Sequence, residues 1–144
     1  MRIAQISCGT EWSGIQQELD KAAEAVGAEI FFPEASLEEV DLGLEKLAFS
    51  PASHNLRVML GQALALDYYP DVEGVLILTC FRCAEGSLTR MVVRRYLQKR
   101  FNVPIITYSY TERTKSGNLL LRMEALANLI RRRELLKVKS HEGL

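Results

Sequence analysis

Three cysteines carry the most distinctive chemistry in this chain. Cys8 follows the apolar run of residues 3–7, and Cys80 follows the apolar run of residues 75–79. Cys83 comes three residues after Cys80 and opens a helical pattern. If both runs are parallel strands, all three thiols lie at the same edge of one sheet. Three thiols gathered at one edge predict a metal site, and we expect an iron–sulfur cluster there.

The spacing of the cysteines suits a [4Fe–4S] cluster. Cys80-x-x-Cys83 supplies two ligands on one turn, and the N–H groups of a helix start favour thiolates. Cys8 supplies the third ligand, and water, a substrate, another residue or a second subunit supplies the fourth. Zinc is the main rival, with His54 as its fourth ligand. A thioredoxin-like Cys80–Cys83 dithiol is a further alternative, although it leaves Cys8 unexplained.

Polar loops follow the same strands and supply candidate cofactor-binding residues. The turn after the first strand has glycines that let a ligand approach the backbone, but it lacks the Gly-Lys-Ser/Thr element of a Walker loop. Arg82 and Glu85 flank the cysteine pair. Glu112 and Arg113, after the last strand, either line the site or form a cap and a surface ion pair. The candidate binding residues are Gly9, Thr10, Ser13, Gly14, Arg82, Glu85, Glu112 and Arg113.

The elements that must position these residues alternate between strands and helices. Apolar residues at every second position, or in a continuous run, predict strands, whereas apolar residues spaced three and four apart predict helices. We predict strands over residues 2–8, 28–32, 74–79 and 104–110. We predict helices over residues 12–26, 36–49, 53–68, 84–101 and 114–137, with residues 138–144 as a tail or the start of a linker.

This alternation predicts one α/β domain over residues 1–137. The expected architecture is a Rossmann-like or flavodoxin-like three-layer sandwich around a four-stranded parallel sheet. A short first crossover and a long second one favour the strand order 2-1-3-4. Ligands of such sheets bind where the strand order reverses, which places Cys8 and Cys80 at that point.

Composition and charge narrow the function classes. The chain is 48% hydrophobic and 25% charged, and no apolar stretch reaches the length of a membrane span. It shows no signal-peptide core, so we expect a cytoplasmic protein with reduced thiols.

Charge is distributed unevenly along the chain. Residues 1–79 contain four Lys or Arg and 13 Asp or Glu, whereas residues 80–144 contain 14 Lys or Arg and five Asp or Glu. Such halves can attract each other, pair between the subunits of a homodimer or dock a charged partner. The chain has no recognised nucleic-acid-binding motif.

Four segments together resemble a known family. They are Cys8-Gly9-Thr10-Glu11-Trp12-Ser13-Gly14, Thr79-Cys80-Phe81-Arg82-Cys83-Ala84-Glu85, Tyr108-Ser109-Tyr110-Thr111-Glu112-Arg113-Thr114 and Arg122-Met123-Glu124-Ala125-Leu126. They resemble the N-terminal region of methanogenesis marker protein 15, itself similar to part of the D component of 2-hydroxyacyl-CoA dehydratases. The resemblance implies an anaerobic source and kinship with subunits that hold a [4Fe–4S] cluster on three cysteines. It also implies electron supply by an ATP-dependent activase domain or protein.

The chain departs from those families at two points. It has no Asp-x-Gly-Ser phosphate motif, so the resemblance does not extend to ATPase activity. The ligand spacing of the dehydratases does not match Cys80-x-x-Cys83 either. From the sequence we therefore expect an iron–sulfur domain for low-potential electron transfer or enzyme activation. The alternatives are a non-enzymatic docking module with packed or zinc-bound cysteines, and the dithiol redox domain.

Overall fold

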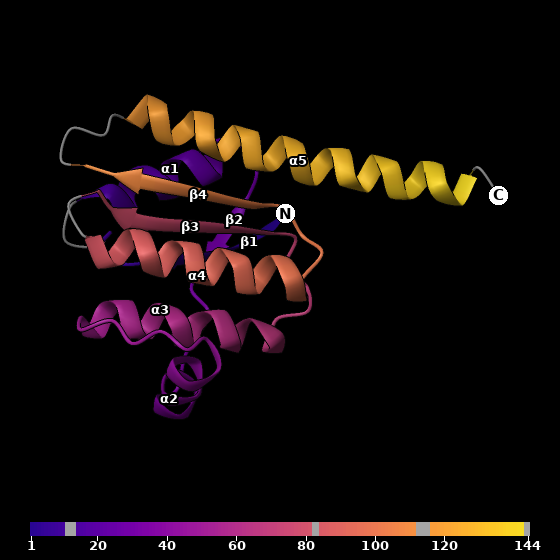
Figure 1. Cartoon of the computed structure of the whole chain (residues 1–144). Helices are drawn as coiled ribbons and strands as arrows, with labels where there is room; N and C mark the ends of the chain where they lie inside the picture. The colour runs from indigo at the N-terminus through magenta and orange to yellow at the C-terminus, as the bar shows by residue number, and fades with distance from the viewer. Residues whose placement is uncertain (11–13, 82–83, 112–115, 143–144) are drawn as a thin grey trace.

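A computed structural model of the chain describes residues 1–10, 14–81, 84–111 and 116–142, and it has the expected α/β architecture (Figure 1). Strands alternate with helices along the chain. The elements are β1 (Arg2–Ser7), α1 (Ile15–Ala25), β2 (Glu29–Phe31), α2 (Leu37–Lys46), α3 (His54–Ala65), the 3-10 turn η1 (Leu66–Tyr68), β3 (Gly74–Cys80), α4 (Ala84–Arg100), β4 (Ile105–Tyr110) and α5 (Ser116–Glu142).

All four strands form one parallel sheet in the order β2-β1-β3-β4, which confirms the predicted topology. The central strand β3 is buried along nearly its whole length, as a strand covered on both faces must be. Its neighbours β1 and β4 pair with it residue by residue, so their carboxyl ends meet at one edge. We call this the carboxyl edge.

Two apolar cores lie on the two faces of the sheet. Helices α1 and α5 cover one face, where Leu19 and Met123 pack against Leu76. Helices α3 and α4 cover the other face, where Leu60 and Val93 pack with Ile77. Helix α2 lies outside α3, which makes this side of the molecule thicker (Figure 1). Alternate residues of each strand therefore point to opposite cores.

Helix α2 is fixed by its cap and by close contact with α3. The Ser36 side chain accepts a hydrogen bond from the Glu39 backbone, and the Glu39 carboxylate accepts one from the Ser36 backbone. Gly61 on α3 lets the two helices approach closely. A Cβ atom there would lie 2.8 Å from Val40 Cγ2 and 3.0 Å from Ala35 Cβ.

Ion pairs close the end of the sheet opposite the carboxyl edge. The Arg2 guanidinium contacts Asp71, holds the pKa of that carboxyl below its ordinary value and lies 4.2 Å from the centre of the Phe31 ring. Arg100 on α4 donates to both carboxylate oxygens of Asp67, at 2.8 and 2.6 Å. These pairs hold η1 and the loop before β3 against the rest of the fold at this end of the sheet.

One boundary differs from the prediction. We expected the last helix to end near Lys137 and residues 138–144 to form a tail or linker, but α5 continues to Glu142. No glycine or proline stands between Lys137 and Glu142, so nothing in that stretch breaks the helix. The helix projects beyond the sheet with no core beneath its last turns (Figure 1). Among the described residues, no helix has both the length and the apolarity that a membrane crossing requires.

The α2–α3 contact yields a stability test. Gly61→Ala should lower the free energy of unfolding by about 1–3 kcal/mol, because the added methyl group clashes with Val40 and Ala35. Gly117→Ala on α5 is the matched control. A Cβ atom there meets no described residue within 4 Å, so this change should leave stability equal or raise it by about 0.5–1 kcal/mol. Urea denaturation of both variants checks the contrast, and equal midpoints would refute the close packing.

Candidate functional site

Cys8 and Cys80 lie on neighbouring strands at the carboxyl edge. Ser7 is paired with Leu78, and the Cys8 N–H donates to the Leu78 carbonyl at 3.3 Å, which extends the ladder past the end of β1. Cys80 is the last residue of β3. With strands about 4.8 Å apart and a rise of about 3.3 Å per residue, their Cα atoms are separated by about 6 Å. Both residues are half-buried thiols.

The pleat of the sheet directs these two side chains to opposite faces. Cys8 packs against the core beneath α3 and α4, whereas Cys80 packs against the core beneath α1 and α5. The register explains the difference, because Cys8 stands level with Thr79 rather than with Cys80. A ligand held by both thiols must therefore lie beyond the strand ends and not against either face. The sequence predicted that both cysteines lie at the carboxyl edge, but it did not reveal that their side chains point to opposite faces of the sheet.

A hydrogen bond from Tyr110 holds the backbone at Cys8. Tyr110 ends β4, and its hydroxyl donates to the Cys8 carbonyl oxygen. Because β3 lies between β1 and β4, this contact spans the carboxyl edge. The next residue, Gly9, has a φ of 72°, and a Cβ atom there would lie 2.8 Å from the Tyr110 hydroxyl oxygen. Only glycine fits this turn without displacing the tyrosine.

A buried polar network fixes the other side of the same turn. Gln5 is fully buried, and its amide forms a reciprocal pair with the amide of Gln16, at 2.7 and 3.0 Å. The Thr10 hydroxyl donates to Gln16 at 2.9 Å, and Gln5 donates to Ser7 Oγ at 2.9 Å. Buried polar groups are stable only when they are paired in this way. Thr10, proposed as a ligand contact, thus joins β1 to α1 within the protein.

Other proposed site residues have structural partners or lie outside the description. The Glu85 carboxylate accepts a hydrogen bond from the Ala52 backbone at 2.7 Å and so joins the start of α4 to the loop before α3. Gly14 precedes α1 with a left-handed φ of 75°. The remaining candidates, Ser13, Arg82, Cys83, Glu112 and Arg113, lie outside the described residues. Within the described ranges, no three His, Cys, Asp or Glu residues are close enough to hold a metal ion.

Sequence reasoning missed residues that shape this edge. The sequence placed Tyr110 at the end of a strand, and Gln62 and Arg90 within helices, but assigned them no role at this edge. Arg90 on α4 contacts Ser109 and lies 3.4 Å from the Thr79 hydroxyl. The available signal was a glutamine inside an otherwise apolar run, as at Gln5 and Gln62, because such a residue needs a buried partner.

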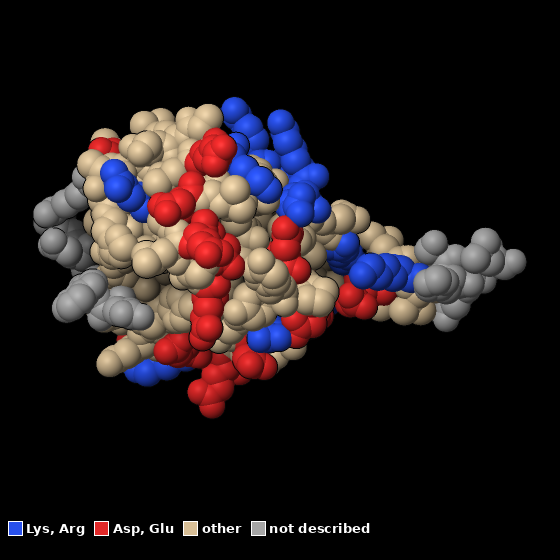
Figure 2. All heavy atoms as spheres, turned by 90° about the horizontal axis from the view of Figure 1, so that it is seen from below, with Lys and Arg blue, Asp and Glu red and all other residues tan. Residues whose placement is uncertain are grey.

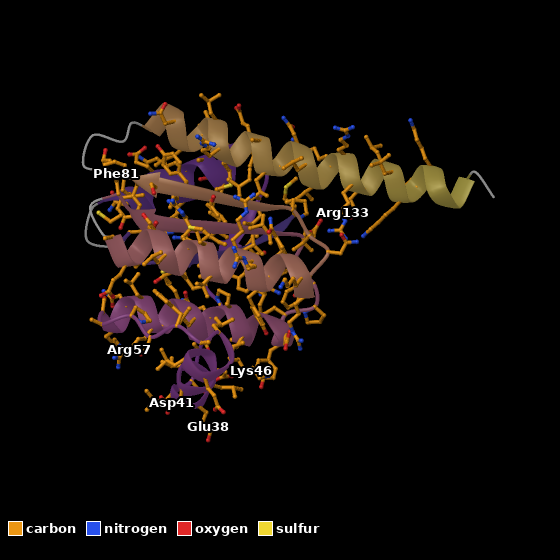
Figure 3. All side chains as sticks on the ribbon, viewed as in Figure 1. Glu38, Asp41, Lys46, Arg57, Phe81 and Arg133 are labelled. Carbon is orange, nitrogen blue, oxygen red and sulfur yellow. The ribbon has the colours of Figure 1, made fainter. Side chains whose placement is uncertain are left out.

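Helix starts surround the carboxyl edge. Helices α1, α4 and α5 follow strands and α3 precedes one, so all four begin at this edge (Figure 1). Helix N-termini carry partial positive charge and unpaired N–H groups, which favour anions and thiolates. The first turn of α3 contains no acidic residue that would neutralise this field. Phe81, which is 68% exposed, adds an apolar side chain directly after Cys80 (Figure 3).

The outer face of α2 is acidic. Figure 2 shows a band of acidic side chains over this helix, which includes the exposed Glu38, Asp41 and Glu45. Figure 3 shows Glu38 and Asp41 pointing away from the body of the molecule. These residues form the acidic surface over α2.

Comparison with known proteins gives one informative relative. The chain is 46% identical over 145 residues to the uncharacterized protein MJ0800 of Methanocaldococcus jannaschii. The match covers 100% of this chain and 35% of that protein, so the chain spans about a third of the relative's length. No protein-family model matches the chain, and no solved structure matches it. The resemblance to methanogenesis marker protein 15 remains a prediction.

The contact between Gly9 and Tyr110 gives a second test. Gly9→Ala should destabilise the protein by more than about 1–2 kcal/mol, because it adds a clash with the tyrosine hydroxyl to the penalty of a left-handed φ. Gly14→Ala has the same φ penalty, but among the described residues a Cβ atom there has no neighbour within 4 Å. In a Tyr110→Phe background the difference between the two variants should shrink. Thermal and urea unfolding of this set measures it, and an unchanged difference would contradict the assigned contact.

Proposed function

We propose that this chain is an iron–sulfur domain in which Cys8, Cys80 and Cys83 hold a [4Fe–4S] cluster at the carboxyl edge. The observation that carries the proposal is the arrival of Cys8 and Cys80 on neighbouring strand ends, about 6 Å apart at Cα. Cys83 stands directly before the first residue of α4 in the sequence. Under the proposal, Cys83 supplies the third thiolate beside these two strand ends.

The surroundings suit a thiolate-bound cluster. Thiolates are the ligands of such clusters, and helix N-termini lower thiol pKa values and favour the negative charge of the assembly. Four helix starts face this edge, and the first turn of α3 has no competing acid. The opposite pleat parity of Cys8 and Cys80 requires the cluster to sit outside the strand ends, where loop residues can cover it. Three protein thiols leave one iron for a ligand from outside the cysteine set.

Such a cluster supplies low-potential electron transfer, or activation of another enzyme. The hydrogen bond from Tyr110 to the Cys8 carbonyl and the amide network around Gln5 would keep the Cys8 backbone in place while the cluster is reduced and oxidised. The resemblance adds an anaerobic organism as the setting and an ATP-dependent activase domain or protein as the electron donor, and we propose the cytoplasm as the location. A homodimer is the arrangement in which a second subunit would supply the fourth ligand.

A second candidate function is a docking module with packed or zinc-bound cysteines. Two observations favour it, namely the opposite faces taken by Cys8 and Cys80 and the acidic surface over α2 (Figure 2). Under this alternative the partner is basic, and the thiols serve packing or zinc binding with His54. A Cys80–Cys83 dithiol redox domain is a third candidate, supported by the half-buried Cys80 thiol.

Metal content separates these candidates. Anaerobic reconstitution with iron and sulfide should give about four irons and four sulfides per chain and a brown protein. Each of the variants Cys8→Ser, Cys80→Ser and Cys83→Ser should lose most of this iron, because each removes one thiolate. Iron and sulfide analysis, together with EPR after reduction, provides the measurement.

His54→Ala is the matched control for this series. His54 lies exposed at the start of α3, so its loss should leave the cluster intact while weakening any four-ligand zinc site. A colourless product with less than one iron per chain would refute the cluster. Zinc binding that depends on His54 would favour the docking module. A reversible Cys80–Cys83 disulfide without metal would favour the dithiol domain.

A further inference from the structure

The two edges of the sheet differ in how they are protected against pairing with another strand. At one edge β2 has only three residues, and Pro33 follows shortly after its end. Short strands and prolines keep a sheet edge from pairing with other chains. At the other edge β4 has six residues without a proline or a charged side chain, and its register with β3 has no bulge. Among the described residues, β4 therefore remains open to a further strand.

The hydrogen bonds to β3 show which backbone groups of β4 face outward. The Val75 N–H of β3 donates to the Pro104 carbonyl oxygen at 2.9 Å. In a parallel ladder every second residue of a strand bonds to the same neighbour, so the even-numbered residues of β4 bond to β3. The N–H and C=O groups of Ile105, Thr107 and Ser109 point the other way. Within the described part of the chain these groups have no hydrogen-bond partner.

Arginine side chains flank this edge from the helices on both sides of it (Figure 1). On α4, Arg90 and Arg94 contact hydroxyl groups of β4 side chains. On α5, the Arg122 guanidinium lies 5.3 Å from the centre of the Tyr108 ring. None of these three arginines forms an ion pair with a described carboxylate. The edge thus carries positive charge that an acidic partner would neutralise.

Apolar side chains accompany the arginines. A hollow of about 470 Å³ lies between α5 and β4, and it is lined by Tyr108, Asn118, Leu121, Arg122 and Ala125. Leu121 is 64% exposed, and no acidic residue is among the described residues of this lining. On the other side Met91 is 56% exposed and stands one turn before Arg94 on α4. A strand laid along β4 would therefore meet apolar surface as well as charge.

We propose that β4 is a docking edge for an extended segment of a partner protein, in which acidic residues alternate with apolar ones. The segment adds a fifth strand to the sheet. Its backbone bonds to the outward groups of β4, and its alternate side chains give specificity. On one face its carboxylates pair with Arg90 and Arg94. On the other face its apolar side chains enter the hollow beside Leu121, where the charge of Arg122 adds to the attraction.

A second copy of this chain fits the edge poorly. Two β4 strands related by a two-fold axis would bring the arginines of both copies to the same ribbon, and like charges opposite each other are destabilising. The proposal requires the β4 edge and its arginines but no thiol. It is therefore independent of the iron–sulfur cluster.

Amide hydrogen exchange with a heptapeptide of alternating glutamate and valine, capped at both ends, tests the proposal. At saturation, exchange at Ile105, Thr107 and Ser109 should slow about tenfold or more, because their N–H groups gain partners. The even-numbered residues of β4 should change little, since they already bond to β3. A peptide with lysine in place of glutamate should bind about tenfold more weakly or worse.

Two N-methylated peptides test the strand pairing itself. One is methylated at the glutamate amides and the other at the valine amides. Only alternate amides of an added strand face β4, so one of the two peptides should lose binding and the other should keep it. Equal binding of both, or loss of binding by both, would overturn the proposed pairing.

Arg94→Glu should weaken binding of the glutamate peptide about fivefold or more at about 0.15 M salt, because attraction becomes repulsion. Arg95→Glu is the matched control. Arg95 is also exposed on α4 but lines a different hollow with Lys46 and Leu47, so its replacement should leave affinity nearly unchanged. Equal losses in the two variants would contradict the proposal.

Three further results would also overturn it. They are equal affinity of the lysine and glutamate peptides, no binding of the glutamate peptide, and slow exchange at the odd-numbered amides of β4 in the protein alone. The last result would show that a second copy occupies the edge. The same measurements apply with and without reconstituted iron, so failure of this proposal leaves the cluster untouched.

Discussion

The hydrogen bond from the Tyr110 hydroxyl to the Cys8 carbonyl is the constraint on which the carboxyl edge depends. It joins the end of β4 to the end of β1 across the intervening strand β3. Its presence explains why residue 9 is glycine, since a Cβ atom would press on the tyrosine oxygen. The amide pair of Gln5 and Gln16 holds the same turn from the side of α1. The first thiol of the chain is thus fixed at its backbone by contacts from both directions.

The turn that follows β1 serves two faces of the sheet at once. On one face Thr10 and Ser7 take part in the hydrogen-bond network that joins β1 to α1. On the other face Cys8 and Gly9 border a hollow that is also lined by Val58 and Gln62 of α3. The cluster proposed beyond the strand ends would adjoin this turn at Cys8.

Much of this architecture could be predicted from the sequence. Apolar runs, helical periodicity and crossover lengths were sufficient for the parallel sheet in the order β2-β1-β3-β4, because burial on two faces leaves a clear pattern. The parity of Cys8 and Cys80 could not be predicted, since a shift of one residue in register reverses every side chain. The partners of Tyr110 and Glu85 were also hidden, because each contacts backbone groups that no residue pattern marks. The end of α5 was misjudged because its last residues show helix propensity without an apolar face.

The central claim is that three thiolates bind one cluster and leave one iron without a cysteine. Mössbauer spectroscopy of protein reconstituted anaerobically with iron-57 tests it most directly, because that method resolves individual iron sites. The account predicts one iron site that differs from the other three, and loss of the whole pattern when Cys8 is replaced by serine. An iron spectrum unaffected by the Cys8 replacement, or the absence of any cluster signal, would contradict it.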